Sequence, residues 1–152
     1  MTQRTLKDIL CAMDSFVADR IFVDAPADVV YRALLNAEDA MVWLGADSAF
    51  IDARPGGVFR AERSDGSNVS GVIARLEETT RIELGEYYHE ASGVRRGPMR
   101  VELLVTPHGA GVWLMARQDG LDSQSDWKQF AEATRREWVR ATVALKRHVE
   151  GI

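Results

Sequence analysis

The stretch Asp24-Ala-Pro-Ala-Asp28-Val-Val-Tyr31-Arg-Ala-Leu34, continued by Met41-Val-Trp43-Leu-Gly45 and Asp52-Ala-Arg-Pro55-Gly56-Gly57-Val-Phe59-Arg60, decides the fold of this chain. Pro26 suits the first position of a helix and Asp28 suits its positive N-terminal end, which predicts a helix over 26–35. A second helical turn is expected over 37–43, and Gly45 and Pro55-Gly56-Gly57 mark the turns that follow it. The stretch therefore predicts a strand that leads into two short helices and then into a sheet.

Alternating apolar and polar residues predict strands on both sides of this stretch. Their ranges are 15–23, 48–53, 58–63, 69–76, 81–89, 98–106 and 112–118. Only short turns separate the later strands, which favours an antiparallel meander over a parallel sheet with crossover helices. The fold class is thus α+β, with a curved antiparallel sheet.

A long helix is predicted over 125–149, at the end of the chain. Its large side chains recur at steps of four and three, so they share one face: Trp127, Ala131, Thr134, Trp138, Ala141, Leu145 and His148. We expect this face to lie against the sheet, because two tryptophans would otherwise stand in water. The sheet would then wrap around the helix in a helix-grip arrangement.

The first residues form a separate segment. Leu6, Ile9, Leu10 and Met13 have the spacing of a short amphipathic helix. We therefore expect a helical extension over 1–14 and one domain over 15–152.

The composition narrows the choice of partners. Of the 152 residues, 19 are basic and 23 acidic, and the net charge is -4, so no face basic enough for nucleic acid is expected. The one cysteine, Cys11, has no partner for an internal disulfide, and no apolar run is long enough to insert into a membrane. A cytoplasmic protein is expected. The three histidines lie far apart in sequence and Cys11 stands alone, so no metal site is expected. The sequence contains no phosphate loop or dinucleotide-binding fingerprint, so no other cofactor is expected.

Together with Gly71-Val-Ile, Glu137-Trp138-Val and Leu145-Lys-Arg-His-Val-Glu150, the opening motifs carry a family resemblance. From about Val17 to its end, the chain resembles the SRPBCC or START-like superfamily. It is most similar to the branch of the C-terminal domain of the activator of the heat-shock chaperone ATPase. The resemblance implies an elongated apolar cavity between the sheet and the long helix, and it supplies no shared catalytic residue. It also implies a chaperone as one partner.

Glu86 is the one candidate for acid or base chemistry. Strict alternation places Ile82, Leu84, Glu86 and Tyr88 on one face of their strand, and the two aliphatic residues identify that face as the inner one. A buried carboxylate needs a partner, which would be an arginine, water or a ligand. Glu86 is thus either a structural or cavity-mouth residue or the acid/base of a cyclase-like or hydrolase-like enzyme.

Two faces of the sheet are possible for Trp113 and Met115. Similarity to the family places Leu114 and Gln118 inside, which leaves Trp113 and Met115 on the outer face as an apolar patch for a partner. That partner would be another protein or a second copy of the chain. With the opposite parity, Trp113 would line the cavity instead.

The leading hypothesis is a binding module for a small apolar or amphipathic molecule. The alternatives are a protein-interaction domain and an enzyme that uses Glu86. The predicted ligand-binding residues lie on the second short helix, on the sheet and on the long helix, where they form either cavity walls or plain core. They are Trp43, Phe59, Glu86, Tyr88, Leu114, Gln118, Trp127, Thr134 and Trp138.

Overall fold

The computed structural model of the protein describes residues 16–121 and 126–151. Strand β1 (Phe16–Val23) is followed by helices α2 (Ala27–Leu35) and α3 (Ala37–Leu44). The remaining strands are β2 (Ser48–Ile51), β3 (Val58–Glu62), β4 (Asn68–Glu77), β5 (Arg81–Ala91), β6 (Val94–His108) and β7 (Gly111–Asp119). Helix α4 (Trp127–Glu150) is the last element. This order and these bounds confirm the predicted α+β class.

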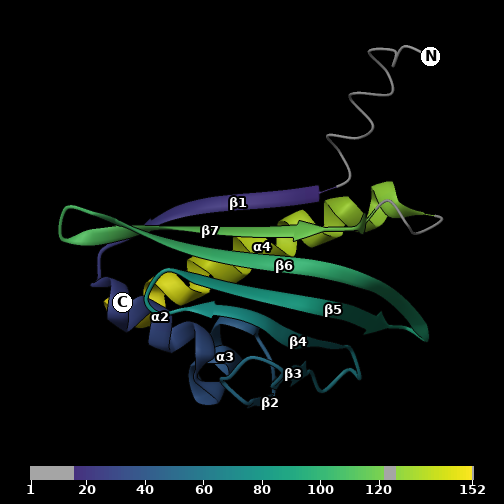
Figure 1. Ribbon diagram of the computed structural model, residues 1–152. Coiled ribbons are helices and arrows are strands. Elements are labelled where there is room, and N and C mark those ends of the chain that lie inside the picture. Colours follow the sequence, from purple (N-terminus) through teal and green to yellow (C-terminus); the bar gives the residue numbers. More distant parts are fainter. Residues whose placement is uncertain (1–15, 122–125, 152) are drawn as a thin grey trace, which may run out of the picture.

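The described strands form one antiparallel sheet in the order β1-β7-β6-β5-β4-β3-β2. The sheet curves, and α4 runs across one of its faces (Figure 1). Helix α3 packs against α4, β2 and β3, and α2 packs against α3, α4 and β6. The predicted helix-grip arrangement is therefore correct.

Local signals explain where the helices begin and end. Asn36 caps α3, because its side-chain oxygen accepts a hydrogen bond from the backbone N–H of Asp39 at 3.1 Å. Gly45 ends the helix in the left-handed conformation, with φ of 63°, which costs a glycine little. The helical extension predicted over 1–14 lies outside the described residues. None of the helices in the described residues could span a membrane.

The core lies between the sheet and α4. The rings of Trp43 and Trp138 stack with their centres 6.5 Å apart, and Phe59 packs on Trp43 at 6.3 Å. Beyond the tryptophan pair, Leu145 meets aliphatic residues of α2, β6 and β7 and leaves a void of only about 10 Å³. We call this region the filled end, defined by Leu34, Trp43, Leu103, Leu114 and Leu145.

The inward orientation predicted for Glu86 is wrong. Strand β5 has an irregular register with β6 between Leu84 and Tyr87, and Glu86 has φ of 45°. The bulge inserts an unpaired residue, so the alternation changes phase there. Tyr87 is buried in place of Glu86, which is exposed, and Tyr88 lies on the other face with Arg95 stacked on its ring.

Strand β7 keeps the parity that the family resemblance implied. Leu114 and Gln118 are buried, and Trp113 and Met115 point to the opposite face. Trp113 packs edge-on against Phe22 at 5.5 Å, and the guanidinium of Arg20 covers its ring at 4.3 Å. Trp113 is therefore half-buried on the outer face rather than part of the cavity wall.

Candidate functional site

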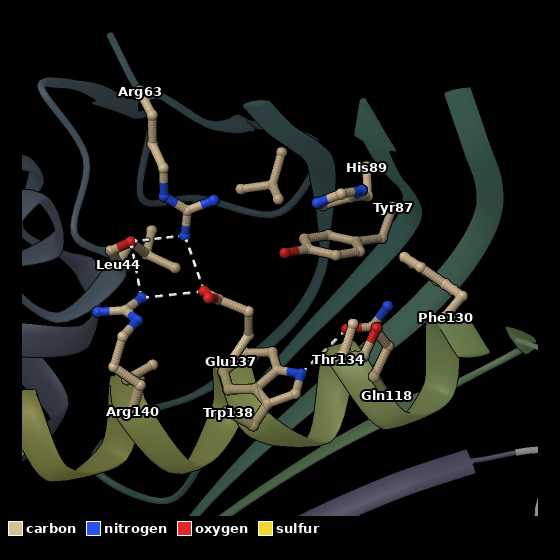
Figure 2. Close-up of a pocket in the computed structure, with 13 residues that line it drawn as sticks. Leu44, Arg63, Tyr87, His89, Gln118, Phe130, Thr134, Glu137, Trp138 and Arg140 are labelled. Carbon is tan, nitrogen blue, oxygen red and sulfur yellow. Dashed lines mark hydrogen bonds and ion pairs between the residues drawn. The ribbon is translucent and has the colours of Figure 1, made fainter. Parts of the chain in front are cut away.

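A pocket of about 110 Å³ lies between the sheet and the first half of α4. Side chains from β4, β5 and β7 form one wall and side chains from α4 form the other, while Leu44 and Arg63 close the α3 side (Figure 2). We call it the open pocket, lined by Leu44, Arg63, Val69, Tyr87, His89, Gln118, Phe130, Ala133, Thr134, Glu137, Trp138, Arg140 and Ala141.

A hydrogen-bonded pair fixes the floor of the open pocket. The indole N–H of Trp138 donates to Oε1 of Gln118 at 3.0 Å, and the Gln118 amide donates to Sδ of Met99 at 3.2 Å. All three residues are buried, so these bonds satisfy polar groups that have little access to water. The Trp138 ring is thereby held in one orientation and forms both a wall of the pocket and a boundary of the filled end.

Tyr87 projects its phenol into the open pocket (Figure 2). The bulge at Glu86 turns the ring inward, and Gly71 on the neighbouring strand makes room for it. A Cβ on Gly71 would stand 3.2 Å from the ring. The Tyr87 hydroxyl makes no hydrogen bond within the described residues. Burial raises its pKa, so the group stays a protonated donor at neutral pH.

His89 lies next to Tyr87 on the pocket wall. Its ring packs on Phe130 with the centres 5.5 Å apart, and its Nδ1 is buried without a hydrogen-bond partner among residues 16–121 and 126–151. Burial lowers the pKa of His89, and the positive charges of Arg63 and Arg96 lower it further. His89 is therefore neutral at pH 7 and lines the pocket as an uncharged imidazole.

An ion cluster stands at the mouth. Arg63 and Arg140 each donate to the backbone carbonyl oxygen of Leu44, at 2.8 and 3.0 Å. Both also donate to the same carboxylate oxygen of Glu137, at 3.0 and 3.1 Å. The cluster joins the end of α3, the β3–β4 turn and α4, so it positions three elements around the opening (Figure 2).

Only part of the predicted set meets at the open pocket. Gln118, Thr134 and Trp138 line it, whereas Trp43 and Leu114 belong to the filled end and Phe59 is core beside Trp43. Trp127 is half-buried and packs at the edge of the core, outside the residues that line the pocket. Glu86 and Tyr88 take no part in the pocket, because the β5 bulge turns them away from it.

Several residues that line the pocket were not predicted from the sequence. The alternation that places Glu86 and Tyr88 inside puts Tyr87 and His89 on the outer face, and Phe130 lies on α4 between Trp127 and Ala131 of the predicted stripe but is not part of it. Gly85, an isolated glycine inside a strand pattern, is the signal that predicts a bulge at this point. No sequence pattern marked the charged residues of the pocket, Arg63, Glu137 and Arg140. Charged residues at a turn and on a long helix are typical of solvated surface.

The lining of the open pocket mixes apolar and polar side chains. It combines an apolar enclosure with a few hydroxyl, amide and imidazole groups that can orient a molecule. No cluster of three metal-ligating side chains occurs among the residues that the structure describes.

Fold and pocket together define a helix-grip protein with a small pocket, the open pocket, under its long helix. Residues 24–150 match the profile of the family described as "Activator of Hsp90 ATPase homolog 1-like protein". The chain belongs to this family, which confirms the predicted SRPBCC resemblance. A comparison with curated proteins gives no match.

Solved structures with low sequence identity share the fold. Protein MLL2253 from Mesorhizobium loti has a TM-score of 0.74 at 16% identity, over 89% of this chain and 96% of that one. The Aha1 dimer from Colwellia psychrerythraea has a TM-score of 0.73 at 12% identity, over 89% and 96% of the two chains. DynU16, described as a putative protein in the dynemicin biosynthetic locus, has a TM-score of 0.74 at 16% identity. That match covers 90% of this chain and 47% of DynU16.

Proposed function

We propose that this protein is a binding module that holds a small amphipathic molecule in the open pocket. The observation that carries the proposal is the combination of apolar walls with polar groups that have no hydrogen-bond partner within the described residues. The Tyr87 hydroxyl, which makes no hydrogen bond within the described residues, and the imidazole of His89 line the same small space as the rings of Phe130 and Trp138. Buried polar groups normally have a partner, so a bound molecule or water supplies the missing hydrogen bonds.

The size of the pocket limits the ligand. A cavity of about 110 Å³ holds a single ring or a short branched chain. For comparison, an apolar cavity of roughly 150 Å³ takes up benzene. The mouth at Glu137 and Arg140, whose side chains are exposed, leaves room for a larger molecule to extend outward. The setting described for DynU16 supports a small-molecule ligand.

Thermal unfolding with a compound panel tests the proposal. The full-length protein is heated with single-ring compounds and short-chain alcohols, acids and amides, since a ligand that binds only the native state raises the melting temperature. At least one class is expected to raise it in proportion to concentration. Thr134→Leu, which fills the pocket, should abolish the shift.

The control for Thr134→Leu is Glu132→Leu, an apolar substitution on the exposed side of the same helix. Its ligand response should match that of the unmodified protein. A panel without any stabilising compound would contradict the proposed function. The same conclusion follows if Thr134→Leu leaves every shift unchanged, because the ligand would then bind elsewhere.

The outer face around Trp113 favours a second candidate, assembly with a second copy of the chain. Trp113 and Met115 lie on the face of β7 opposite to the buried Leu114 and Gln118, and the Colwellia relative is described as a dimer. Light scattering measures the mass, and Trp113→Ser should convert a dimer to a monomer. A monomer before the substitution contradicts this candidate.

The family description suggests a heat-shock chaperone as another partner, and co-purification with such a chaperone tests this.

A further inference from the structure

Positive charge exceeds negative charge at the open pocket. Its lining contains two guanidinium groups, Arg63 and Arg140, and one carboxylate, Glu137. His89 adds no charge at neutral pH, since burial and the nearby arginines lower its pKa. The lining therefore carries one net positive charge that no lining residue neutralises.

Arg63 has free donors on the pocket side. Both of its hydrogen bonds, to the Leu44 carbonyl oxygen and to Glu137, use Nη2. Within the described residues, Nε and Nη1 have no partner, although a guanidinium carries five N–H groups. Figure 2 shows the guanidinium and the Tyr87 hydroxyl directed toward one another across the pocket. The second arginine differs, because Arg140 lies against Gly45 at the outside of the mouth.

We infer that the ligand is a small carboxylic acid whose carboxylate binds between the Arg63 guanidinium and the Tyr87 hydroxyl. This inference rests on the proposed function and names its ligand class. The apolar part of the acid lies against Val69, Phe130 and Trp138, which form the dry portion of the lining. Hydrogen bonds between charged groups are about twice as strong as neutral ones, and an environment shielded from water strengthens them.

Pairs of an acid and its amide test the inference directly. Phenylacetate, benzoate and 3-methylbutanoate are compared by calorimetry with phenylacetamide, benzamide and 3-methylbutanamide, at pH 7.5 and low salt. Each amide keeps the shape of its acid and loses the charge. A hydrogen bond to a charged group contributes enough to favour the best acid over its amide by roughly 10-fold or more.

Variants locate the carboxylate. Arg63→Met keeps most of the side-chain bulk and is expected to weaken binding of the acid by roughly 10- to 100-fold while leaving amide binding unchanged. Tyr87→Phe removes only the hydroxyl and should weaken acid binding by about 5-fold. Arg60→Met is the matched control, because Arg60 is exposed on β3 and lies outside the lining. It should change neither affinity.

Failure of this inference differs from failure of the proposed function. If amides bind as tightly as their acids, or if only neutral panel members bind, the carboxylate inference is overturned and the binding module stands. The same holds if acid binding survives both Arg63→Met and Tyr87→Phe. If nothing in the panel binds, the proposed function fails and the ligand class fails with it.

Discussion

The two halves of α4 cover the sheet in different ways. Toward its C-terminal end, Leu145 fits among Leu34, Leu103 and Leu114 and leaves a void of about 10 Å³. Toward its N-terminal end, the same helix spans a pocket of about 110 Å³. Aliphatic side chains that interdigitate produce the filled end, whereas a phenol, an imidazole and an ion cluster border the open pocket.

The boundary between the two regions is the stacked pair of Trp43 and Trp138. One face of the pair completes the core, and Trp138 turns its N–H toward Gln118 at the floor of the pocket. The difference indicates that the residues of α4 that fill the core and the residues of α4 that line the open pocket lie in separate stretches of the helix. Substitutions in the filled end should change stability, and substitutions in the open pocket should change ligand response.

The largest expected effect is in the filled end. Leu145→Ala removes a side chain that is 1% exposed and should lower the free energy of unfolding by about 2–5 kcal/mol. Thr134→Ala, its counterpart in the open pocket, should cost about 1 kcal/mol or less because the site already contains free space. Urea denaturation measures both. Equal costs would show that the two regions are packed alike.

Trp138 is expected to give the next largest effect. Trp138→Phe loses the hydrogen bond to Gln118 and part of the stacking with Trp43, which should lower the free energy of unfolding by about 1–3 kcal/mol. Trp127→Phe serves as the control, since Trp127 is half-buried at the edge of the core. Urea denaturation of both variants gives the comparison. A larger loss for Trp127→Phe would mean that Trp138 is not the boundary of the core.

The pH dependence of stability tests the burial of His89. Its pKa is lowered in the native state, chiefly by burial, so below pH 6.5 the unfolded chain binds this proton more readily than the native protein. Stability should therefore fall as the pH drops from about 6.5 toward the native pKa, with a slope of at most about 1.4 kcal/mol per pH unit from this one group.

His89→Gln should remove that slope, and urea denaturation between pH 7.5 and 5 measures it as the difference from the unmodified protein. Working with differences matters because carboxylates such as Glu150, whose pKa the hydrogen bond from Lys146 lowers, add their own dependence at lower pH. His108→Gln, on an exposed histidine at the end of β6, should keep the slope. An unchanged slope in His89→Gln would show that the buried imidazole does not govern this pH range.

The smallest effect is expected at Glu86. Because the β5 bulge exposes this side chain, Glu86→Gln should leave the free energy of unfolding within about 0.5 kcal/mol of its original value. The response to any panel compound should also stay the same. A lost ligand response would return Glu86 to the site and contradict the bulge.

Local patterns were enough to predict most of the architecture. Gly45 and Pro55-Gly56-Gly57 mark turns that the structure places as expected, and Pro26, predicted as the first helical residue, is the N-cap of α2. Most of the stripe predicted on α4 is buried, whereas Trp127 is half-buried and His148 is exposed. Three of the predicted ligand-binding residues, Gln118, Thr134 and Trp138, also meet at the open pocket. Thr134 and Trp138 lie on a helix whose periodicity is unbroken, so their side could be inferred by counting, whereas the side of Gln118 followed from the family resemblance.

Counting failed on β5, where the periodicity breaks. The bulge depends on how β5 pairs with β4 and β6, and the register is irregular with both neighbours. Alternation alone placed Glu86 and Tyr88 inside, although the structure places Tyr87 and His89 there. An error of one residue reverses every later side chain of a strand, and this explains why the inner wall of the pocket was misassigned.

The sequence by itself determined the order of the elements, the helix-grip fold and the family, because these follow from turn residues and from spacing within short segments. Tertiary structure alone decided which polar groups meet at the pocket. Arg63 and Glu137 are 74 positions apart in the chain, and only the packing of α4 over the sheet brings them to 3.0 Å. Contacts of this kind depend on the relative placement of whole elements, which no local pattern encodes.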